Sequence, residues 1–138
     1  MHASFDDIEN ILDLCQEAHD LSPHYQKMPS NRDKARQCLE QMILNPMMLV
    51  AYNGDGVLIG LASPAWWHDG LVIADVFCYA RKRGLPLVRE YLAWAKRFPG
   101  KNETSLGVTF GGEAGERTCK LYQRLGLERS GEIHRVIT

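Results

Sequence analysis

The chain has 138 residues, of which 45% are hydrophobic and 24% are charged, as expected for one soluble globular domain spanning residues 1–138. Its formal net charge of −1 excludes a global attraction to nucleic acid or to an anionic membrane, so an anion would have to bind at a local basic cluster. No run approaches the roughly 18 apolar residues of a membrane-spanning helix, and no basic-then-apolar leader opens the chain, which predicts a cytoplasmic protein.

Two helices are predicted in the first third of the chain. Apolar residues recur at helical spacing from Phe5 to Ala18 and again from Ala35 to Ile43. The first helix is expected to end before Ser22-Pro23 and the second at Asn45-Pro46. The expected N-terminal capping pairs are Ser4 with Asp7 and Ser30 with Asp33.

An antiparallel hairpin is predicted next. Two apolar runs, Met47 to Tyr52 and Val57 to Ala62, flank Asn53-Gly54-Asp55-Gly56, and Asn-Gly and Asp-Gly pairs are strong turn signals. The loop that follows carries Trp66 and Trp67. These two side chains are expected either to form a wall of a substrate site or to cover the core.

The central feature of the sequence is a strand, a basic turn and a helix. Leu71 to Cys78 is a short apolar run rich in β-branched residues, which predicts a buried strand. The turn contains Arg81, Lys82, Arg83 and Gly84, and a helix opened by Pro86 runs to Lys96. Because the first N–H groups of a helix lack intrahelical partners and carry a partial positive charge, this arrangement suits a phosphate group.

The C-terminal part is expected to contain a strand from Ser105 to Phe110 that ends at Gly111-Gly112. A helix from about Gly115 to Leu125 follows, with Gly126 as its C-terminal cap. Leu127 to Ser130 and Ile133 to Ile137 then predict a closing hairpin around Gly131. The four cysteines, Cys15, Cys38, Cys78 and Cys119, form no Cys-x-x-Cys pair and have no His at ligand spacing, so we expect buried thiols and no metal site.

Two motifs resemble those of the GNAT superfamily of acyl-CoA-dependent N-acetyltransferases. The run Leu121-Tyr122-Gln123-Arg124-Leu125-Gly126-Leu127 is similar to its Leu-Tyr-x-x-x-Gly-Phe signature. The stretch from Leu71 to Lys96 is similar to its acyl-CoA signature, a strand followed by a Gln/Arg-x-x-Gly-x-Gly/Ala turn that binds the coenzyme A pyrophosphate. Counting from Arg81 places Pro86 in the last position, whereas counting from Tyr79 places Gly84 there, and both alignments stay open.

The resemblance implies an α/β fold with a mixed, mostly antiparallel central sheet, splayed between its two central strands and flanked by helices. It implies acetyl-CoA as co-substrate, no metal, and a small-molecule or peptide amine as acceptor, with a monomer and a homodimer both open. The connection between the first two helices would lie over the acceptor site. Any initial edge strand is short or absent here, because only Met1-His2-Ala3 precede the first helix.

The resemblance assigns the cofactor contacts and the proton donor, whereas the candidate base and substrate residues come from the sequence context. Cofactor contacts are expected from Val76, Phe77, Cys78, Arg81, Lys82, Arg83, Gly84 and Leu85, with a backbone amide near Val76 and Phe77 polarising the thioester carbonyl. Tyr122 matches the usual proton donor. Asp75 is the candidate base, with Asp69, Glu113, Glu116 or a chain of waters as alternatives. Trp66 and Trp67 are the candidate substrate residues.

Two other classes of protein fit parts of the sequence. A catalytically inactive acyl-CoA-binding regulator would keep the Gly84 turn. An interaction module for protein or nucleic acid would use the basic residues 81–83 together with Trp66 and Trp67 on one exposed face, although the nearly neutral net charge argues against nucleic acid.

Overall fold

A computed structural model describes residues 2–108 and 112–138 of the chain. The chain divides into two compact units, Met1–Thr104 and Ser105–Thr138. The larger unit contains the whole sheet and three α-helices, and the smaller unit contains the last helix. The elements are η1 (Phe5–Asp7), α1 (Ile8–Leu21), η2 (Tyr25–Lys27), α2 (Arg32–Leu44), β1 (Met48–Tyr52), β2 (Gly56–Pro64), β3 (Leu71–Ala80), α3 (Gly84–Ala95), β4 (Glu103–Thr104) and α4 (Gly112–Arg124).

The sheet of the first unit has the strand order β1-β2-β3-β4. β1 pairs with β2 and β2 with β3 in antiparallel fashion, so the predicted hairpin and central strand are confirmed. β4 pairs with β3 in parallel over only two residue pairs, Val72 with Glu103 and Ile73 with Thr104. The side chain of Asn102 accepts the N–H of Leu71 at 2.8 Å and fixes this register. The predicted mixed, mostly antiparallel sheet flanked by helices is confirmed.

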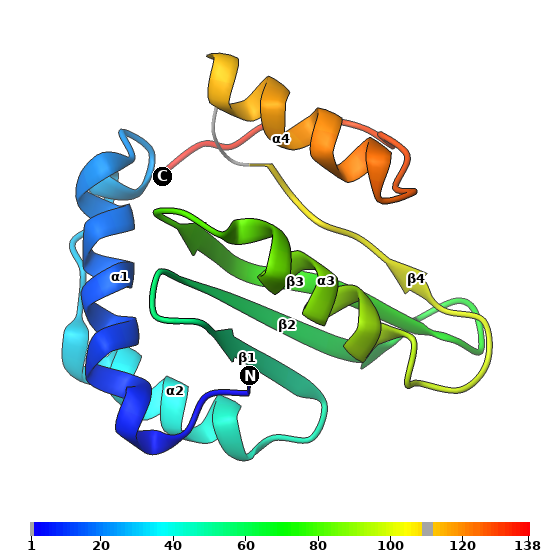
Figure 1. Ribbon diagram of the computed structural model, residues 1–138, viewed down its shortest axis with the longest axis horizontal. Coiled ribbons are helices and arrows are strands. Elements are labelled where there is room, and N and C mark those ends of the chain that lie inside the picture. Colours follow the sequence, from blue (N-terminus) through cyan, green and yellow to red (C-terminus); the bar gives the residue numbers. More distant parts are fainter. Residues whose placement is uncertain (1, 109–111) are drawn as a thin grey trace. The chain divides into compact units, whose positions relative to one another are not determined.

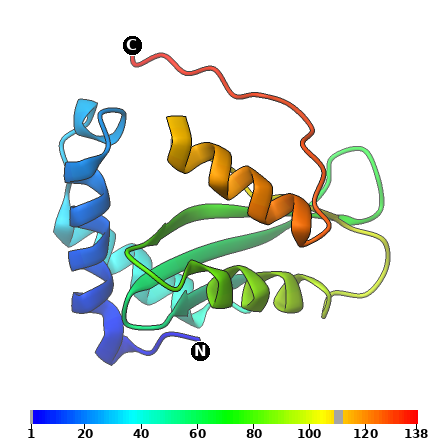
Figure 2. The same cartoon turned by 45° about the horizontal axis from the view of Figure 1, so that its top comes forward.

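Both faces of the sheet are covered within the first unit (Figures 1 and 2). Val57 and Ile59 of β2 belong to one apolar cluster with Ile11 of α1, on the face that α1 and α2 cover. Because side chains alternate along a strand, Gly60 points to the other face, which α3 covers. A Cβ at Gly60 would lie 2.7 Å from the ring of Tyr91, so glycine lets β2 and α3 approach closely.

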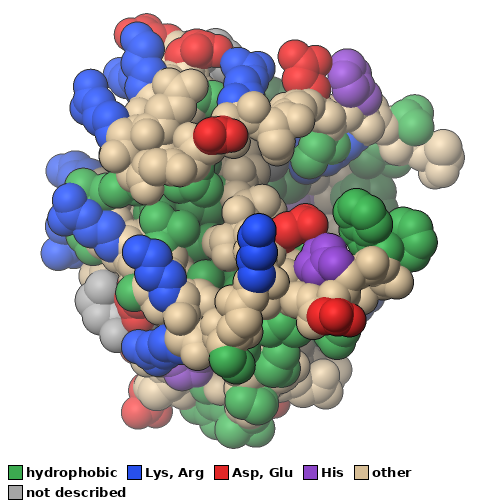
Figure 3. Space-filling model, turned by 90° about the vertical axis from the view of Figure 1, so that its right-hand side faces the viewer, with side chains coloured by type: hydrophobic (Ala, Val, Ile, Leu, Met, Phe, Trp, Pro, Cys, Tyr) green, Lys and Arg blue, Asp and Glu red, His purple; other side chains and the backbone are tan. Residues whose placement is uncertain are grey.

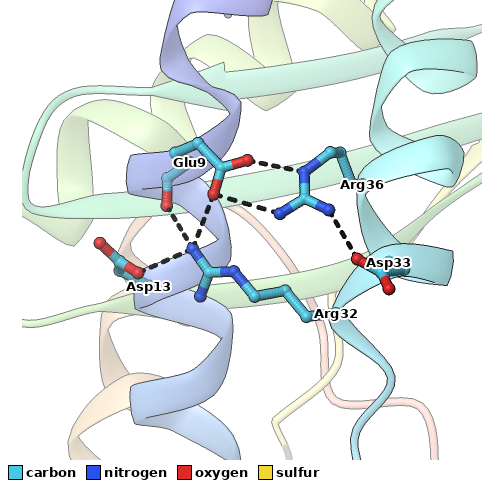
Figure 4. Close-up of polar contacts among 5 residues, drawn as sticks. All are labelled: Glu9, Asp13, Arg32, Asp33 and Arg36. Carbon is cyan, nitrogen blue, oxygen red and sulfur yellow. Dashed lines mark hydrogen bonds and ion pairs between the residues drawn. The ribbon is translucent and has the colours of Figure 1, made fainter.

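Ion pairs connect α1 to α2, as Figure 4 shows. The carboxylate of Glu9 accepts from Arg36 Nε at 2.6 Å and from Arg32 Nη2 at 2.9 Å. Arg32 also donates to Asp13 at 2.9 Å, and Arg36 to Asp33 at 2.8 Å. The hydrogen bonds from Arg36 and Arg32 lower the pKa of Glu9 from 4.5 to about 2. Glu9 is exposed and both arginines are half-buried, so these ion pairs orient two helices whose packing comes from the apolar cluster.

One of the two predicted capping pairs is confirmed. The carboxylate of Asp7 accepts the N–H of Ser4 at 2.9 Å, although the first turn is a 3₁₀-helix and α1 itself begins at Ile8. The pair of Ser30 with Asp33 is wrong. Asn31 is the N-cap of α2, and its side chain accepts the N–H three residues later at 3.0 Å. Asparagine is among the best N-cap residues, whereas the Asp33 carboxylate binds an arginine one turn further along.

The segment before α1 forms a single β-bridge to β1. His2 is bridged to Ala51, and the N–H of Ala3 donates to the carbonyl oxygen of Val50 at 2.7 Å. The N-terminal edge strand is therefore reduced to one bridge, as its three-residue length predicted.

The second unit contains α4 and its C-terminal cap. Gly126 has a φ of +91°, a conformation that glycine adopts without strain. The N–H of Leu127 donates to the carbonyl of Tyr122 at 3.0 Å, and the N–H of Gly126 donates to that of Gln123 at 3.1 Å. These two bonds are those of a Schellman motif, so the predicted cap at Gly126 is confirmed. α4 begins at Gly112, three residues before the expected start.

The strand and the hairpin predicted for the C-terminal part are not found among its described residues. Of the strand expected from Ser105 to Phe110, residues 105–108 form none, residues 109–110 lie outside the described residues, and β4 lies just before, at Glu103–Thr104. The hairpin expected from residues 127–130 and 133–137 is also absent from the described residues. Ile133 and Val136 are 75% and 83% exposed, so no apolar face is buried there to stabilise a two-stranded ribbon.

Candidate functional site

The pairing of β3 with β2 is irregular at Val76. Phe77 lies opposite Ile59 and Asp75 lies opposite Gly60, so Val76 has no partner residue on β2. Such a bulge redirects side chains and is common beside active sites. Asp75 consequently shares the α3 face with Gly60, whereas Phe77 joins the apolar cluster on the α1 and α2 face. The expected carbonyl-polarising amides thus belong to a bulged segment of the central strand.

Within residues 2–104, the other edge of β3 lacks a strand partner along most of its length. The ladder with β4 ends at Ile73, and no strand within residues 2–104 pairs with β3 from Ala74 to Ala80 on that side. Backbone groups along such an edge can pair with an extended ligand, as an added strand would. The edge leads from the bulge at Val76 to the basic turn.

The basic turn leads directly into α3. Residues 81–83 follow the last residue of β3, and the helix begins at Gly84, with Leu85 as its second residue. Pro86, expected at the first helical position, is the third, where an N–H would have no intrahelical partner in any case. A Cβ at Gly84 would lie 3.5 Å from Ala80 Cβ, an ordinary contact. The fold itself therefore does not require glycine at this position.

Arg83, the N-cap residue of α3, has the left-handed backbone conformation, with a φ of 50°. It is the one non-glycine residue with positive φ in the described part of the chain. Its Nε donates to Asp55 Oδ2 at 2.6 Å and its Nη2 to the carbonyl of Asn53 at 3.3 Å. The side chain of Asn53 in turn donates to the carbonyl of Arg83 at 3.0 Å. The β1–β2 turn thus holds the turn that precedes α3.

The supporting residues Asn53 and Asp55 were not predicted as part of the site. Asn53 also forms its own turn, since its side chain accepts the N–H groups of Asp55 and Gly56 at 3.0 and 2.9 Å. The sequence nevertheless contained a signal that these two residues lie beside the basic turn. In an antiparallel pair the start of β2 lies beside the end of β3, as the pairing of Gly56 with Ala80 shows, so an acidic β1–β2 turn lies beside the basic turn.

Arg81 is paired with Glu17 of α1. Its Nε donates to Glu17 Oε2 at 2.8 Å, and the hydroxyl of Tyr79 donates to the same oxygen at 2.6 Å. These hydrogen bonds, first that of Arg81, lower the pKa of Glu17. Burial, followed by the bond to Glu17, raises the pKa of Tyr79 to about 12, so its phenol stays protonated. Of the three expected phosphate-binding cations, Arg81 and Arg83 hold carboxylates, and Lys82 has no ion pair among the described residues.

A pocket of about 300 Å³ lies between α1, the α1–α2 connection and β3. Its walls include Leu12, Cys15, His19, Tyr25, Met28 and Phe77. The rings of Tyr25 and Phe77 are 6.5 Å apart, and burial raises the pKa of the Cys15 thiol to about 11. The resemblance implies that this connection lies over an acceptor site, but it does not identify the residues of the pocket.

Asp75 and Cys78 lie on β3 on either side of the bulged segment. Both are half-buried. Burial, followed by the charge of Asp75, raises the pKa of the Cys78 thiol to about 12. Cys78 is therefore a protonated thiol at neutral pH, and this environment makes it a poor nucleophile.

The loop between β2 and β3 exposes both of its tryptophans. Trp66 and Trp67 are 93% and 71% exposed, so the expectation that they cover the core is wrong. Their rings are 6.3 Å apart, and hydrophobic side chains lie at the surface beside a histidine on this side of the molecule (Figure 3). The loop precedes β3 and the basic turn follows it, so the ten residues of β3, about 30 Å at 3.3 Å per residue, separate them.

Tyr122 lies on α4 in the second unit. Its side chain is buried, with 8% of its surface exposed, and its hydroxyl is 3.5 Å from the carbonyl oxygen of Gly107, a long hydrogen bond. Glu113 and Glu116, two of the alternative bases, are exposed on the first turns of the same helix. The catalytic roles of these residues stay predictions.

Residues 2–108 and 112–138 contain neither a group of side chains suited to a metal ion nor a helix suited to crossing a membrane. No three His, Cys, Asp or Glu side chains there are grouped closely enough to hold a metal ion. None of the helices in that part of the chain has the length and apolar character needed to cross a membrane.

Comparisons with known proteins identify the fold. No protein-family model and no curated protein matches the sequence. A probable acetyltransferase of known structure is similar, with a TM-score of 0.69 at 13% identity over 100% of this chain and 95% of that one. An aminoglycoside acetyltransferase from an uncultured soil metagenomic sample has a TM-score of 0.68 at 14% identity, with coverages of 100% and 95%. A GNAT family acetyltransferase from Staphylococcus aureus has a TM-score of 0.61 at 15% identity, with coverages of 99% and 96%.

Proposed function

We propose that this chain, which has the fold of the GNAT acetyltransferases, transfers an acetyl group from acetyl-CoA to a primary amine. The observation that carries the proposal is the course of β3. A bulge at Val76 leads along an edge that no strand within residues 2–104 pairs with, to a basic turn and to the N-terminus of α3 at Gly84. One ligand that needs all three features in this order is an acyl thioester joined through an extended arm to a pyrophosphate.

The turn would bind the pyrophosphate. The amides of Gly84 and Leu85 begin α3, where the helix dipole favours an anion, and Gly84 leaves space because it has no side chain. Lys82 supplies a cation that holds no carboxylate among the described residues, and Arg81 and Arg83 have donors beyond those bound to Glu17 and Asp55. The amide arm of the coenzyme would pair with the edge of β3 next to Phe77 and Cys78.

The chemistry requires three groups at the thioester. The amine nitrogen attacks the carbonyl carbon, and the oxygen gains negative charge, which a backbone amide at Val76 or Phe77 would stabilise. The C–S bond then breaks, and the thiolate takes a proton from the hydroxyl of Tyr122. The proton lost by the amine would go to Asp75, directly or through water.

The alternative classes make different predictions. An inactive regulator would bind acetyl-CoA but release no thiol with any amine. A module that uses the basic turn and the two tryptophans as one face receives no support, because these features lie at opposite ends of β3.

Thiol release from acetyl-CoA across a panel of primary amines tests the proposal. With an acceptor identified, Tyr122→Phe is expected to lower kcat by about 10²- to 10⁴-fold, the range for a general acid, while the Kd for acetyl-CoA is unchanged. The lost bond to Gly107 is long, so the free energy of unfolding should fall by no more than about 1 kcal/mol.

One result would contradict acetyl transfer, and another would contradict only the role of Tyr122. Acetyl-CoA binding without thiol release for any amine would favour the regulator. An unchanged kcat in Tyr122→Phe, with thiol release intact in the wild type, would leave acetyl transfer standing and remove Tyr122 as its acid.

A further inference from the structure

The pocket beside Phe77 has mostly apolar walls. Aliphatic, sulfur-containing and aromatic side chains form most of them, with Tyr25 and Phe77 contributing two rings that face the same space. The thiol of Cys15 stays protonated because burial raises its pKa to about 11. A cavity of about 150 Å³ with apolar walls holds benzene, so the 300 Å³ of this pocket would accommodate a ring and a short chain.

The charged groups at the pocket are cations. None of the described residues that line it is an Asp or a Glu. Arg32 lies at its edge, where Glu9 and Asp13 already bind the guanidinium at 2.9 Å each (Figure 4). The ring of His19 donates to the carbonyl of Met28 at 2.7 Å, which raises the pKa of His19. The nearby carboxylates, Glu9 and Asp13 at Arg32 and Asp20 at His19 (3.4 Å), are already paired, so a second ammonium group of a ligand would find no carboxylate of its own among the residues that line the pocket.

The position of the pocket connects it to the bulge of β3. Phe77 forms its wall and is the residue directly after Val76. A ring bound against Phe77 is thus one residue along the chain from the backbone that would polarise the thioester. A chain of two or three atoms between the ring and an amine would leave the nitrogen outside the apolar walls.

We propose that the pocket binds the ring of an aromatic amine, so that the acceptor is an arylalkylamine with a single ammonium group rather than a polyamine or an amino sugar. This inference rests on the acetyl transfer proposed above. It assigns the α1–α2 connection, with Tyr25 and Met28, as the segment that selects the acceptor.

The test separates binding from transfer. The binding probe is 2-phenylethanol, which has the ring and chain but no amine, and its Kd is measured by calorimetry without acetyl-CoA. The transfer substrates are 2-phenylethylamine and 1,4-diaminobutane, compared by kcat/KM from thiol release. The variant is Met28→Ala, and the matched control is Leu21→Ala on α1, outside the pocket, since these side chains are 56% and 65% exposed and neither change removes core packing.

We expect 2-phenylethanol to bind, and Met28→Ala to raise its Kd about tenfold, because lost apolar contacts in a pocket are worth at least this factor. The same variant should raise the KM for 2-phenylethylamine with little change in kcat, as a loss of uniform binding does. Leu21→Ala should match the wild type, and 1,4-diaminobutane should be the poorer substrate.

The two proposals fail in different ways. Thiol release with 1,4-diaminobutane at least equal to that with 2-phenylethylamine, or a Kd for 2-phenylethanol that Met28→Ala leaves unchanged, would overturn the assignment of the pocket while acetyl transfer stands. Binding of 2-phenylethanol that depends on Met28, without thiol release from any amine, would overturn acetyl transfer and with it the role of the ring as part of an acceptor.

Discussion

Arg83 combines an unfavourable backbone conformation with a set of hydrogen bonds that maintain it. A left-handed residue other than glycine costs about 1–2 kcal/mol, and here the β1–β2 turn binds both the side chain and the carbonyl of the residue. Strained residues that their surroundings maintain are frequent at ligand sites. The left-handed conformation of Arg83 sets the direction in which α3 begins, and the start of α3 is where the pyrophosphate is proposed to bind.

The effect of a substitution at Arg83 on the free energy of unfolding should therefore depend on how well the new residue tolerates a positive φ. Arg83→Gly is expected to keep the free energy of unfolding within about 1 kcal/mol of the wild type, since the relief of strain offsets the flexibility that glycine adds to the unfolded chain. Arg83→Val should lower it by about 2 kcal/mol, because a β-branched residue is a poor fit at positive φ. Urea denaturation measures both.

Lys82→Val is the control for that comparison, since Lys82 is exposed in the same turn and has negative φ. It should differ from the wild type by less than about 0.5 kcal/mol, as surface substitutions usually do. Equal stability of Arg83→Val and Lys82→Val would show that the backbone at Arg83 carries no strain.

At the scale of elements, the contact between α1 and α2 combines apolar packing with the ion pairs of Glu9. The pKa of Glu9 is about 2 in the folded protein, below the ordinary value of 4.5, because Arg36 and Arg32 donate to its carboxylate. A lowered pKa means that the ionised carboxylate favours the folded state. Its contribution is complete above pH 4.5 and is lost as the pH falls toward 2.

Glu9→Gln should remove this pH dependence. Above pH 4.5 the variant is expected to unfold at a lower urea concentration than the wild type, and the difference between the two midpoints should shrink between pH 4.5 and pH 3. Glu116→Gln, an exposed change on α4, should follow the wild type at each pH. A constant difference between Glu9→Gln and the wild type from pH 7 to pH 3 would contradict the assigned linkage.

The elements that sequence analysis predicted correctly are those whose signals are local. The Asn53 to Gly56 turn, the run from Leu71 and the Gly126 cap each depend on a few adjacent residues, and all three are confirmed. The hairpin at residues 127–137 has equally suitable residues but no buried face, and burial is a tertiary property. The bulge at Val76 left no local signal, because it depends on how β2 and β3 are paired.

The same distinction applies to the candidate site. The basic turn and Gly84 were evident from the sequence, yet the carboxylates bound to Arg81 and Arg83 come from α1 and from the β1–β2 turn. The pocket beside Phe77 likewise combines side chains of α1, the α1–α2 connection and β3. Such combinations follow from the sheet order and the helix packing, which sequence periodicity alone does not specify.

At the scale of the whole molecule, acetyl-CoA should stabilise the folded chain. A ligand that binds only the native state adds RT ln(1 + [L]/Kd) to the free energy of unfolding, about 2.7 kcal/mol at a hundredfold excess over Kd. For a chain of 138 residues this corresponds to a rise in Tm of roughly 5–10 °C.

Substitutions at Gly84 test whether the shift comes from binding at the N-terminus of α3. A Cβ at residue 84 meets only Ala80, at 3.5 Å, so a side chain there should leave the free protein folded. Gly84→Glu is expected to abolish the shift, since its carboxylate would lie where the helix N-terminus should bind the pyrophosphate. Gly84→Gln, which has the same size without the charge, should keep part of the shift, and Gly84→Ala more of it. A wild-type Tm that millimolar acetyl-CoA leaves unchanged would remove the cofactor from this protein, whereas equal shifts in the wild type and in Gly84→Glu would place the pyrophosphate away from α3.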